Sequence, residues 1–173
     1  MLIRPATIRD ARAIARVQVR AWHMAYRGII PDAYLAGFTL EHRTNRWLTN
    51  LAELRRMETA VAEDDDAIVG WAGFGANESD LGPEVAELGG LYVDPAHWDR
   101  GTGACLLSYA EKELAAGFGE AILWTLEENT RSRRFYENRG WRFDGARDRH
   151  RSGAAVVRYR KTLSLVDPTT ASA

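Results

Sequence analysis

The chain has 173 residues, 46% of them hydrophobic, which is enough to bury the core of one compact domain. Its formal net charge of -1 provides no basic field, so we expect no nucleic-acid partner. A single cysteine, Cys105, and the lack of a signal peptide or long apolar span predict a cytoplasmic protein with no membrane partner. We expect one domain over residues 1–164 and a flexible tail at 165–173.

The first third of the sequence predicts a short strand followed mainly by helices. The strand covers residues 2–6, and Thr7, three residues before Asp10, is close to a capping box that opens a helix ending near Gly28. A short turn or helix through Tyr34 and Leu35 follows. A second long helix is expected over residues 41–54, because its apolar positions recur at helical spacing.

Strands dominate the rest of the chain. Two strands, at 60–62 and 67–76, flank an acidic turn that we interpret as a solvated hairpin tip rather than a metal site. The elements expected after it are a strand at 85–93, a helix ending near 117–119, a strand at 121–126, a helix at 129–138, and strands at 141–146 and 154–162. This order predicts a mixed α/β fold with one parallel crossover among antiparallel hairpins.

The most informative stretch is the one in which the strand at 85–93 leads into a glycine-rich turn. Arg100-Gly101-Thr102-Gly103 precedes a helix, whose first amides lack intrahelical acceptors and can bind a phosphate. A nucleotide P-loop would need Gly-Lys-Ser/Thr here, and a dinucleotide fingerprint would need glycine or alanine in place of Leu106. A phosphorylated ligand of another kind is therefore favoured.

Two motifs resemble those of the GNAT acetyltransferase superfamily. Arg100, Gly103 and Cys105 match the Arg-x-x-Gly-x-small spacing of its pyrophosphate loop, with cysteine where glycine or alanine is usual. The run Asn129-x-x-Ser132-x-x-Phe135-Tyr136-x-x-x-Gly140-Trp141 is similar to its Asn-x-x-Ala-x-x-Phe-Tyr…Gly-Phe signature. The resemblance implies the GNAT fold, whose mixed, mostly antiparallel sheet of about six or seven strands is split near residues 85–93.

The resemblance also implies a cofactor and the residues that bind it. The cofactor is acetyl-CoA, with no metal, and its pantetheine arm pairs with the strand backbone near Leu91 and Val93. His97 and Trp98 are further candidates for contacts with its phosphates or adenine. The implied cofactor-binding residues are Leu91, Tyr92, Val93, Arg100, Gly101, Thr102, Gly103, Ala104, Cys105, Asn129 and Ser132.

The reaction implied is attack of an amine on a thioester, which builds negative charge on the carbonyl oxygen and then expels a thiolate. Tyr136 is the implied acid at the sulfur, and the amide of Leu91 or a neighbour is the candidate oxyanion donor. Glu87 is the candidate base, with His23 as the alternative; alternation along the strand places Glu87 on the same face as Gly89 and Leu91. The mid-strand pair Gly89-Gly90 marks a bulge or a close ligand.

The acceptor site is expected among the first helices. Trp22, His23 and Tyr26 are the candidate substrate-binding residues, although aromatic residues at helical spacing also fit a core. The sequence thus predicts an N-acetyltransferase that acetylates a primary amine of a small molecule, or a protein N-terminus or lysine, by direct attack in a ternary complex. A non-catalytic acyl-CoA sensor, a longer acyl group and a homodimer remain open, and Cys105 is not expected to carry the acyl group.

Overall fold

The computed structural model describes residues 1–53, 57–77, 79 and 81–164. The tail expected at 165–173 therefore lies outside the described residues. In the first part of the chain the elements are β1 (Leu2–Pro5), the 3₁₀ turn η1 (Ile8–Asp10), α1 (Ala11–Ala25), α2 (Asp32–Ala36), α3 (Leu40–Ala52), β2 (Met57–Asp64) and β3 (Ala67–Ala76). They are followed by β4 (Val85–Val93), the 3₁₀ turn η2 (Pro95–His97), α4 (Thr102–Ala115), β5 (Glu120–Leu126), α5 (Thr130–Glu137), β6 (Arg142–Arg149) and β7 (Ala155–Thr162).

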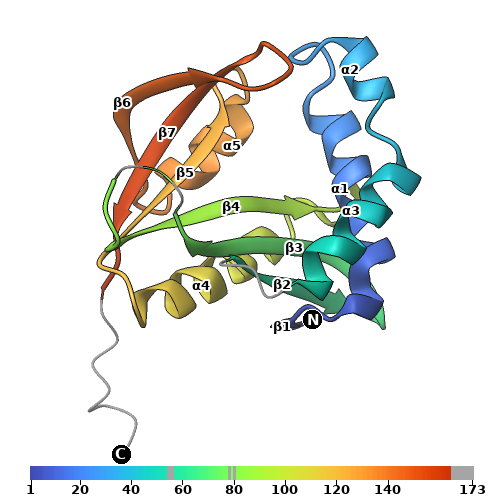
Figure 1. Cartoon of the computed structure of the whole chain (residues 1–173), viewed down its shortest axis with the longest axis horizontal. Coiled ribbons are helices and arrows are strands. Elements are labelled where there is room, and N and C mark those ends of the chain that lie inside the picture. Colours follow the sequence, from blue (N-terminus) through green and yellow to red (C-terminus); the bar gives the residue numbers. More distant parts are fainter. Residues whose placement is uncertain (54–56, 78, 80, 165–173) are drawn as a thin grey trace, which may run out of the picture.

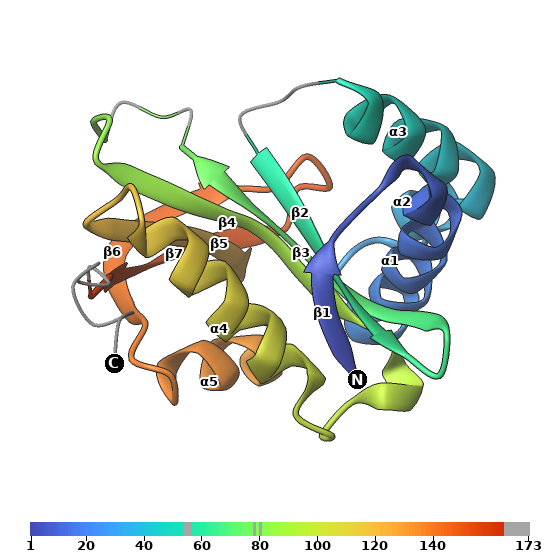
Figure 2. The same ribbon diagram turned by 90° about the horizontal axis from the view of Figure 1, so that it is seen from below.

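In the described part of the chain, seven strands form one sheet in the order β1-β2-β3-β4-β5-β7-β6. Neighbouring strands are antiparallel except β4 and β5, which are parallel and joined through α4. Helices α1 and α3 pack on one face of the β1–β4 part, and α4 packs on the other (Figures 1 and 2). The mixed α/β fold with a mostly antiparallel sheet is confirmed.

The sheet splits between β4 and β5. Their pairing within the described residues covers Val85 with Glu120, Ala86 with Ala121 and Glu87 with Ile122. β4 then continues to Val93 along β3, whereas β5 continues along β7 and diverges from β4 (Figure 1). The second half of β4 therefore has β3 along one edge, and its other edge faces the split.

A β-bulge at the two glycines changes which side chains share a face of β4. Glu87 pairs with Gly75 and Leu88 with Phe74, but the next pair is Gly90 with Gly73, so that Gly89 is an extra residue. Cross-strand partners share a face. The bulge expected at the glycines is thus confirmed, but the prediction that Glu87 shares a face with Leu91 is wrong, because the extra residue inverts the alternation.

Several element ends differ from the sequence prediction. β2 runs from Met57 to Asp64 rather than 60–62, because its pairing with β3 continues into the hairpin. β6 extends to Arg149, beyond the expected end at 146, although nearly all of its residues are exposed. Pairing with β7, rather than burial of an apolar face, sustains this edge strand.

A charged cluster ties β1 to the start of α1. Asp10 is 8% exposed, and its carboxylate accepts hydrogen bonds from the Thr7 amide (2.8 Å) and from both terminal nitrogens of Arg4 (2.8 and 2.9 Å). Arg4 also donates to Glu63 on β2 (2.6 Å). The hydrogen bonds from Arg4 lower the pKa of Asp10 to about 2. The interaction expected between Thr7 and Asp10 is thus present, with Arg4 as an unforeseen partner.

Replacing Asp10 by Asn should lower the free energy of unfolding at pH 7 by about 1–3 kcal/mol, because charge-assisted hydrogen bonds are lost. The pKa of Asp10 is lower in the folded protein, so this contribution is present above about pH 4, the ordinary carboxyl value, and fades as the pH falls toward 2. Urea denaturation at pH 7, 4 and 2.5 measures it. Asp66→Asn, in the exposed hairpin turn, is the control, and a pH-independent loss in Asp10→Asn would contradict the assignment.

Candidate active site

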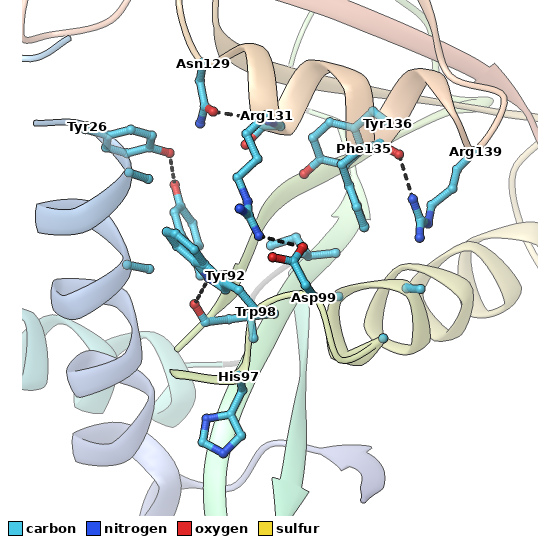
Figure 3. Close-up of a pocket in the computed structure, with 18 residues that line it drawn as sticks. Tyr26, Tyr92, His97, Trp98, Asp99, Asn129, Arg131, Phe135, Tyr136 and Arg139 are labelled. Carbon is cyan, nitrogen blue, oxygen red and sulfur yellow. Dashed lines mark hydrogen bonds and ion pairs between the residues drawn. The ribbon is translucent and has the colours of Figure 1, made fainter. Parts of the chain in front are cut away.

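A pocket of about 350 Å³ lies where the sheet splits (Figure 3). It combines one end of α1, the last residues of β4, the loop that leads into α4, and one side of α5. Its lining residues are Ala21, Ala25, Tyr26, Leu91, Tyr92, Val93, His97, Trp98, Asp99, Gly101, Gly103, Ala104, Asn129, Arg131, Ser132, Phe135, Tyr136 and Arg139.

The N-terminus of α4 forms one wall of the pocket. Gly101 is its N-cap residue and has φ of 85°, a conformation that favours glycine. The first intrahelical bond runs from the Cys105 amide to the Gly101 carbonyl (3.0 Å), so the amides of Thr102, Gly103 and Ala104 precede the intrahelical ladder. These amides and the helix dipole suit a phosphate group.

The loop residues expected to bind the cofactor separate into two groups. Gly101, Gly103 and Ala104 line the pocket, whereas Arg100, Thr102 and Cys105 lie outside it. The Thr102 side chain is buried beneath the helix, and Cys105 is exposed on its outer side. The hydrogen bond from its amide to Gly101 also withdraws Cys105 from the set of free donors.

The main chain of β4 supplies a hydrogen-bonding edge. The Asp94 amide donates to the Val69 carbonyl of β3 (2.8 Å). Because peptide groups alternate in direction along an antiparallel ladder, those of Leu91 and Val93 face the split instead. The Val93 carbonyl already accepts a hydrogen bond from Trp98 Nε1 (2.8 Å), in agreement with this direction. The remaining groups of Leu91 and Val93 can pair with an extended ligand.

Helix α5 brings the second motif to the opposite side of the pocket. Asn129 is buried and caps the helix, since its Oδ1 accepts a hydrogen bond from the Ser132 amide (3.1 Å). Both residues also line the pocket. Phe135 packs against the core and also lines the pocket, and a Cβ on Gly103 would lie 3.5 Å from its ring.

Tyr136 is a buried tyrosine on the same helix. It is 8% exposed, and its ring packs edge-on against Phe135 and Trp141 with centroids 5.2 and 6.1 Å away. Burial raises the pKa of Tyr136 well above its ordinary value, and the nearby Tyr92 hydroxyl adds to this shift. The hydroxyl therefore stays protonated at neutral pH and can donate a hydrogen bond inside the pocket.

Tyr26 and Tyr92 form a hydroxyl pair across the pocket from Tyr136 (Figure 3). Their oxygens lie 3.2 Å apart, and burial raises the pKa of both. The side chain of Tyr92 points to the α1 side of the sheet, where its ring lies 5.1 Å from that of Trp71. This contact joins residues 66 positions apart, and sequence spacing gave no sign of it.

The three expected acceptor-site residues differ in position. Tyr26 lines the pocket, but Trp22 is 8% exposed and stacks on Phe38 at 4.0 Å, within a core formed with α2. His23 is half-buried and lies outside the pocket. Of the possible roles for Trp22, packing in the core is the one that the structure supports.

Glu87 lies at the last pair of β4 with β5 and is half-buried. It shares a face with Gly90 and Tyr92, the side that carries α1, and it lies outside the pocket lining. The Glu87 side chain therefore lies on the opposite face of β4 from Leu91. Because Glu87 is the last residue of β4 that pairs with β5, it marks the point where the split begins.

Three charged lining residues were missing from the sequence prediction, namely Asp99, Arg131 and Arg139. Asp99 has φ of 60° and Arg131 stands in the first turn of α5, where a cation is unfavourable, but neither feature singles out a residue without the fold. Among the described residues, no three His, Cys, Asp or Glu side chains are placed to hold a metal ion. None of the described helices combines the length and apolar character needed to cross a membrane.

Within the part of the chain that the structure describes, the pocket thus combines free helix amides, an unpaired strand edge and a buried phenol hydroxyl that can donate a hydrogen bond. This combination suits a long phosphorylated ligand with its reacting end inside the split.

Comparisons with known proteins agree with this geometry. Residues 19–141 match the model of the acetyltransferase (GNAT) family. The chain is 30% identical over 129 residues to YuaI of Bacillus subtilis (strain 168), which is described as an uncharacterised N-acetyltransferase. The aligned region covers 73% of this chain and 72% of YuaI.

Solved structures share the fold. PaiA N-acetyltransferase of Thermoplasma acidophilum, solved in complex with coenzyme A, superposes on this chain with a TM-score of 0.71 and is 21% identical to it. The match covers 92% of this chain and 98% of the PaiA chain. The ribosomal-protein-alanine N-acetyltransferase of Brucella melitensis has a TM-score of 0.72 and 23% identity, and the match covers 94% of this chain and 100% of that one. The chain belongs to the GNAT acetyltransferase family, whose members use acetyl-CoA, and is an acyltransferase.

Proposed function

We propose that the protein transfers an acetyl group from acetyl-CoA to a primary amine of a small molecule, by direct attack in a ternary complex. The observation that carries the proposal is that one pocket joins the amides at the start of α4, the split-facing edge of β4 and the Tyr136 hydroxyl. An enzyme of this kind needs all three, whereas an acyl-CoA sensor has no need of a proton donor at the sulfur.

In the proposed complex the cofactor extends from the mouth of the pocket into the split. The amides of Gly103 and Ala104 bind the pyrophosphate, and the pantetheine arm pairs with the main chain of Leu91 and Val93. Asn129 and Ser132 border the arm from α5. The thioester then lies between Leu91 and Tyr136.

The proposed chemistry begins when the neutral amine attacks the thioester carbonyl, forming the C–N bond and an oxyanion. The Leu91 amide donates to that oxyanion. When the C–S bond breaks, the thiolate takes a proton from Tyr136, which regains one from water. The excess proton on nitrogen passes through water to Glu87, which then releases it to solvent, so that one proton leaves the site for each one that Tyr136 regains.

Glu87 is the proposed base because it lies at the closed end of the split, on the face that also carries Tyr92. An alkylamine with a pKa near 10 is only about one part in a thousand neutral at pH 7, so a base assists. Glu87 is not among the residues that line the pocket, so the proposed proton path from the amine to Glu87 passes through a water molecule. His23 on α1 is the second candidate.

Tyr136→Phe should lower kcat by roughly 100-fold while the KM for acetyl-CoA stays within about twofold, because the acid is lost but the ring remains. Steady-state kinetics with a thiol-detecting reagent measures both. Tyr109→Phe, which removes a hydroxyl on α4 outside the pocket, is the matched control. An unchanged kcat in Tyr136→Phe would remove this residue from the mechanism.

Gly103→Glu should abolish coenzyme A binding, with a loss of roughly 100-fold or more, since its carboxylate repels the pyrophosphate at the helix N-terminus. A Cβ there makes ordinary contacts of 3.5 Å with Phe135 and 3.7 Å with Leu91, so the fold should survive. Calorimetric titration and a thermal melt separate the two effects. Gly117→Glu, at the other end of α4 with open space around it, should bind normally.

Glu87→Gln should lower kcat/KM for the amine by roughly 100-fold near pH 7, and the deficit should shrink toward pH 10, where the amine is itself neutral. The pH–rate profiles of the two enzymes test this. Glu84→Gln, an exposed residue just before β4, is the control. If the pH–rate profiles of wild type and Glu87→Gln have the same shape, Glu87 is not the base, and the same experiment is then done on a variant of His23.

The acceptor is identified by measuring coenzyme A release across a panel of amines. The panel contains small polyamines, aminoglycosides, amino acids, and peptides with a free N-terminus or lysine; the last class is included because a structural neighbour is named as acting on a ribosomal-protein alanine. Acetyl-CoA binding without release for any amine would contradict turnover and favour a sensor. Propionyl-CoA and butyryl-CoA in parallel test the acyl preference.

A further inference from the structure

Arg131 links the two walls of the pocket. It extends from α5 toward the loop before α4, where its NH2 nitrogen lies 2.9 Å from Asp99 Oδ1 (Figure 3). Its Cζ also lies 4.4 Å from the centre of the Trp98 ring. Ion pair and cation–π contact together hold the plane of the guanidinium at the mouth of the pocket.

Both members of this ion pair occupy positions that local preferences disfavour. Arg131 places a positive charge in the first turn of α5, next to the positive end of the helix dipole and with no acidic residue in that turn. Asp99 has φ of 60°, in the left-handed region. Neither residue stabilises its own helix or loop locally, and residues of this kind are concentrated at functional sites.

Coenzyme A carries two separate anionic groups, the pyrophosphate and the 3′-phosphate of its ribose. The amides of α4 serve the first of them. Among the described lining residues, Arg131 and Arg139 are the permanent cations. Arg139 donates to the Phe135 carbonyl (3.0 Å) and lies over the Phe135 ring (4.1 Å), and that ring faces Gly103 at the start of α4. Arg139 therefore lies on the pyrophosphate side.

We propose that Arg131 binds the 3′-phosphate of the cofactor and makes the enzyme discriminate coenzyme A from 3′-dephospho-coenzyme A. Trp98 holds the guanidinium flat, and its planar fork matches the oxygens of a phosphate. This inference rests on the proposed coenzyme A site and adds a specificity-determining residue to it.

Asp99 has a distinct part in this arrangement. Its carboxylate pairs with the same guanidinium that the phosphate uses, and it repels a phosphate placed nearby. It therefore limits the affinity for the phosphorylated cofactor. Asn can take its place without backbone strain, because asparagine also tolerates positive φ.

The test is calorimetric titration of the protein with coenzyme A and, separately, with 3′-dephospho-coenzyme A. Wild type should prefer coenzyme A by about tenfold or more, as expected for charge-assisted hydrogen bonds. In Arg131→Gln the preference should fall to within about twofold, through weaker binding of coenzyme A alone, and Arg131→Lys should restore part of it. Asp99→Asn should bind coenzyme A roughly two- to fivefold more tightly, with dephospho-coenzyme A unchanged.

Arg134→Gln is the matched control, since Arg134 is an exposed arginine on the same helix outside the pocket. Its preference should equal that of wild type. A preference that survives in Arg131→Gln, or an equal loss of affinity for both ligands, would overturn the assignment. Wild-type protein that binds neither ligand would instead refute the proposed function, so the two failures are distinguishable. Because it weakens binding of the phosphorylated cofactor, Arg131→Gln should also raise the KM for acetyl-CoA.

Discussion

The limited pairing between β4 and β5 is the constraint on which the site depends. The two strands pair over residues 85–87 and 120–122 and then follow different partners, β3 and β7. Exposed strand edges are costly unless their amides and carbonyls find partners. Here the Val93 carbonyl is bonded by Trp98, while the rest of the edge forms a pocket wall. The sheet is thus incomplete at the place where an extended ligand can complete it.

The bulge at Gly89 determines which chemistry meets on each face. Because the bulge inverts the alternation, Leu91 packs toward α4 whereas Tyr92 packs toward α1. A Cβ on Gly90 would lie only 2.9 Å from the Trp71 ring, so glycine is required where that indole packs on the strand. One strand therefore borders helix α4 on one side and the tyrosine pair on the other.

Charge is distributed unevenly along the pocket. Its interior holds the hydroxyls of Tyr26, Tyr92 and Tyr136, which burial keeps neutral. Its mouth holds Arg131 with its partner Asp99, and Arg139 lies beside the start of α4. This division suits a ligand that is anionic at one end and uncharged at the reacting end. Neutral donors inside also avoid stabilising the ammonium form of an amine, which cannot attack.

Much of the fold was predictable from local patterns in the sequence. The strand at 85–93, the glycine turn before α4, the Asn129 cap and the place of Tyr136 on α5 all depend on residues within a few positions of one another. Apolar periodicity, capping and turn chemistry act over such distances, so they are readable without the fold. The family motifs then gave the arrangement of the sheet.

What only the tertiary structure decided concerns contacts between distant segments. The side of the sheet occupied by Glu87 depends on a bulge against β3, and Trp22 became a core residue because α2 folds back against α1. The Tyr26–Tyr92 pair and the Arg131–Asp99 pair join residues 66 and 32 positions apart. Local sequence specifies which element forms and where it ends, but the partner of a side chain depends on how those elements pack together.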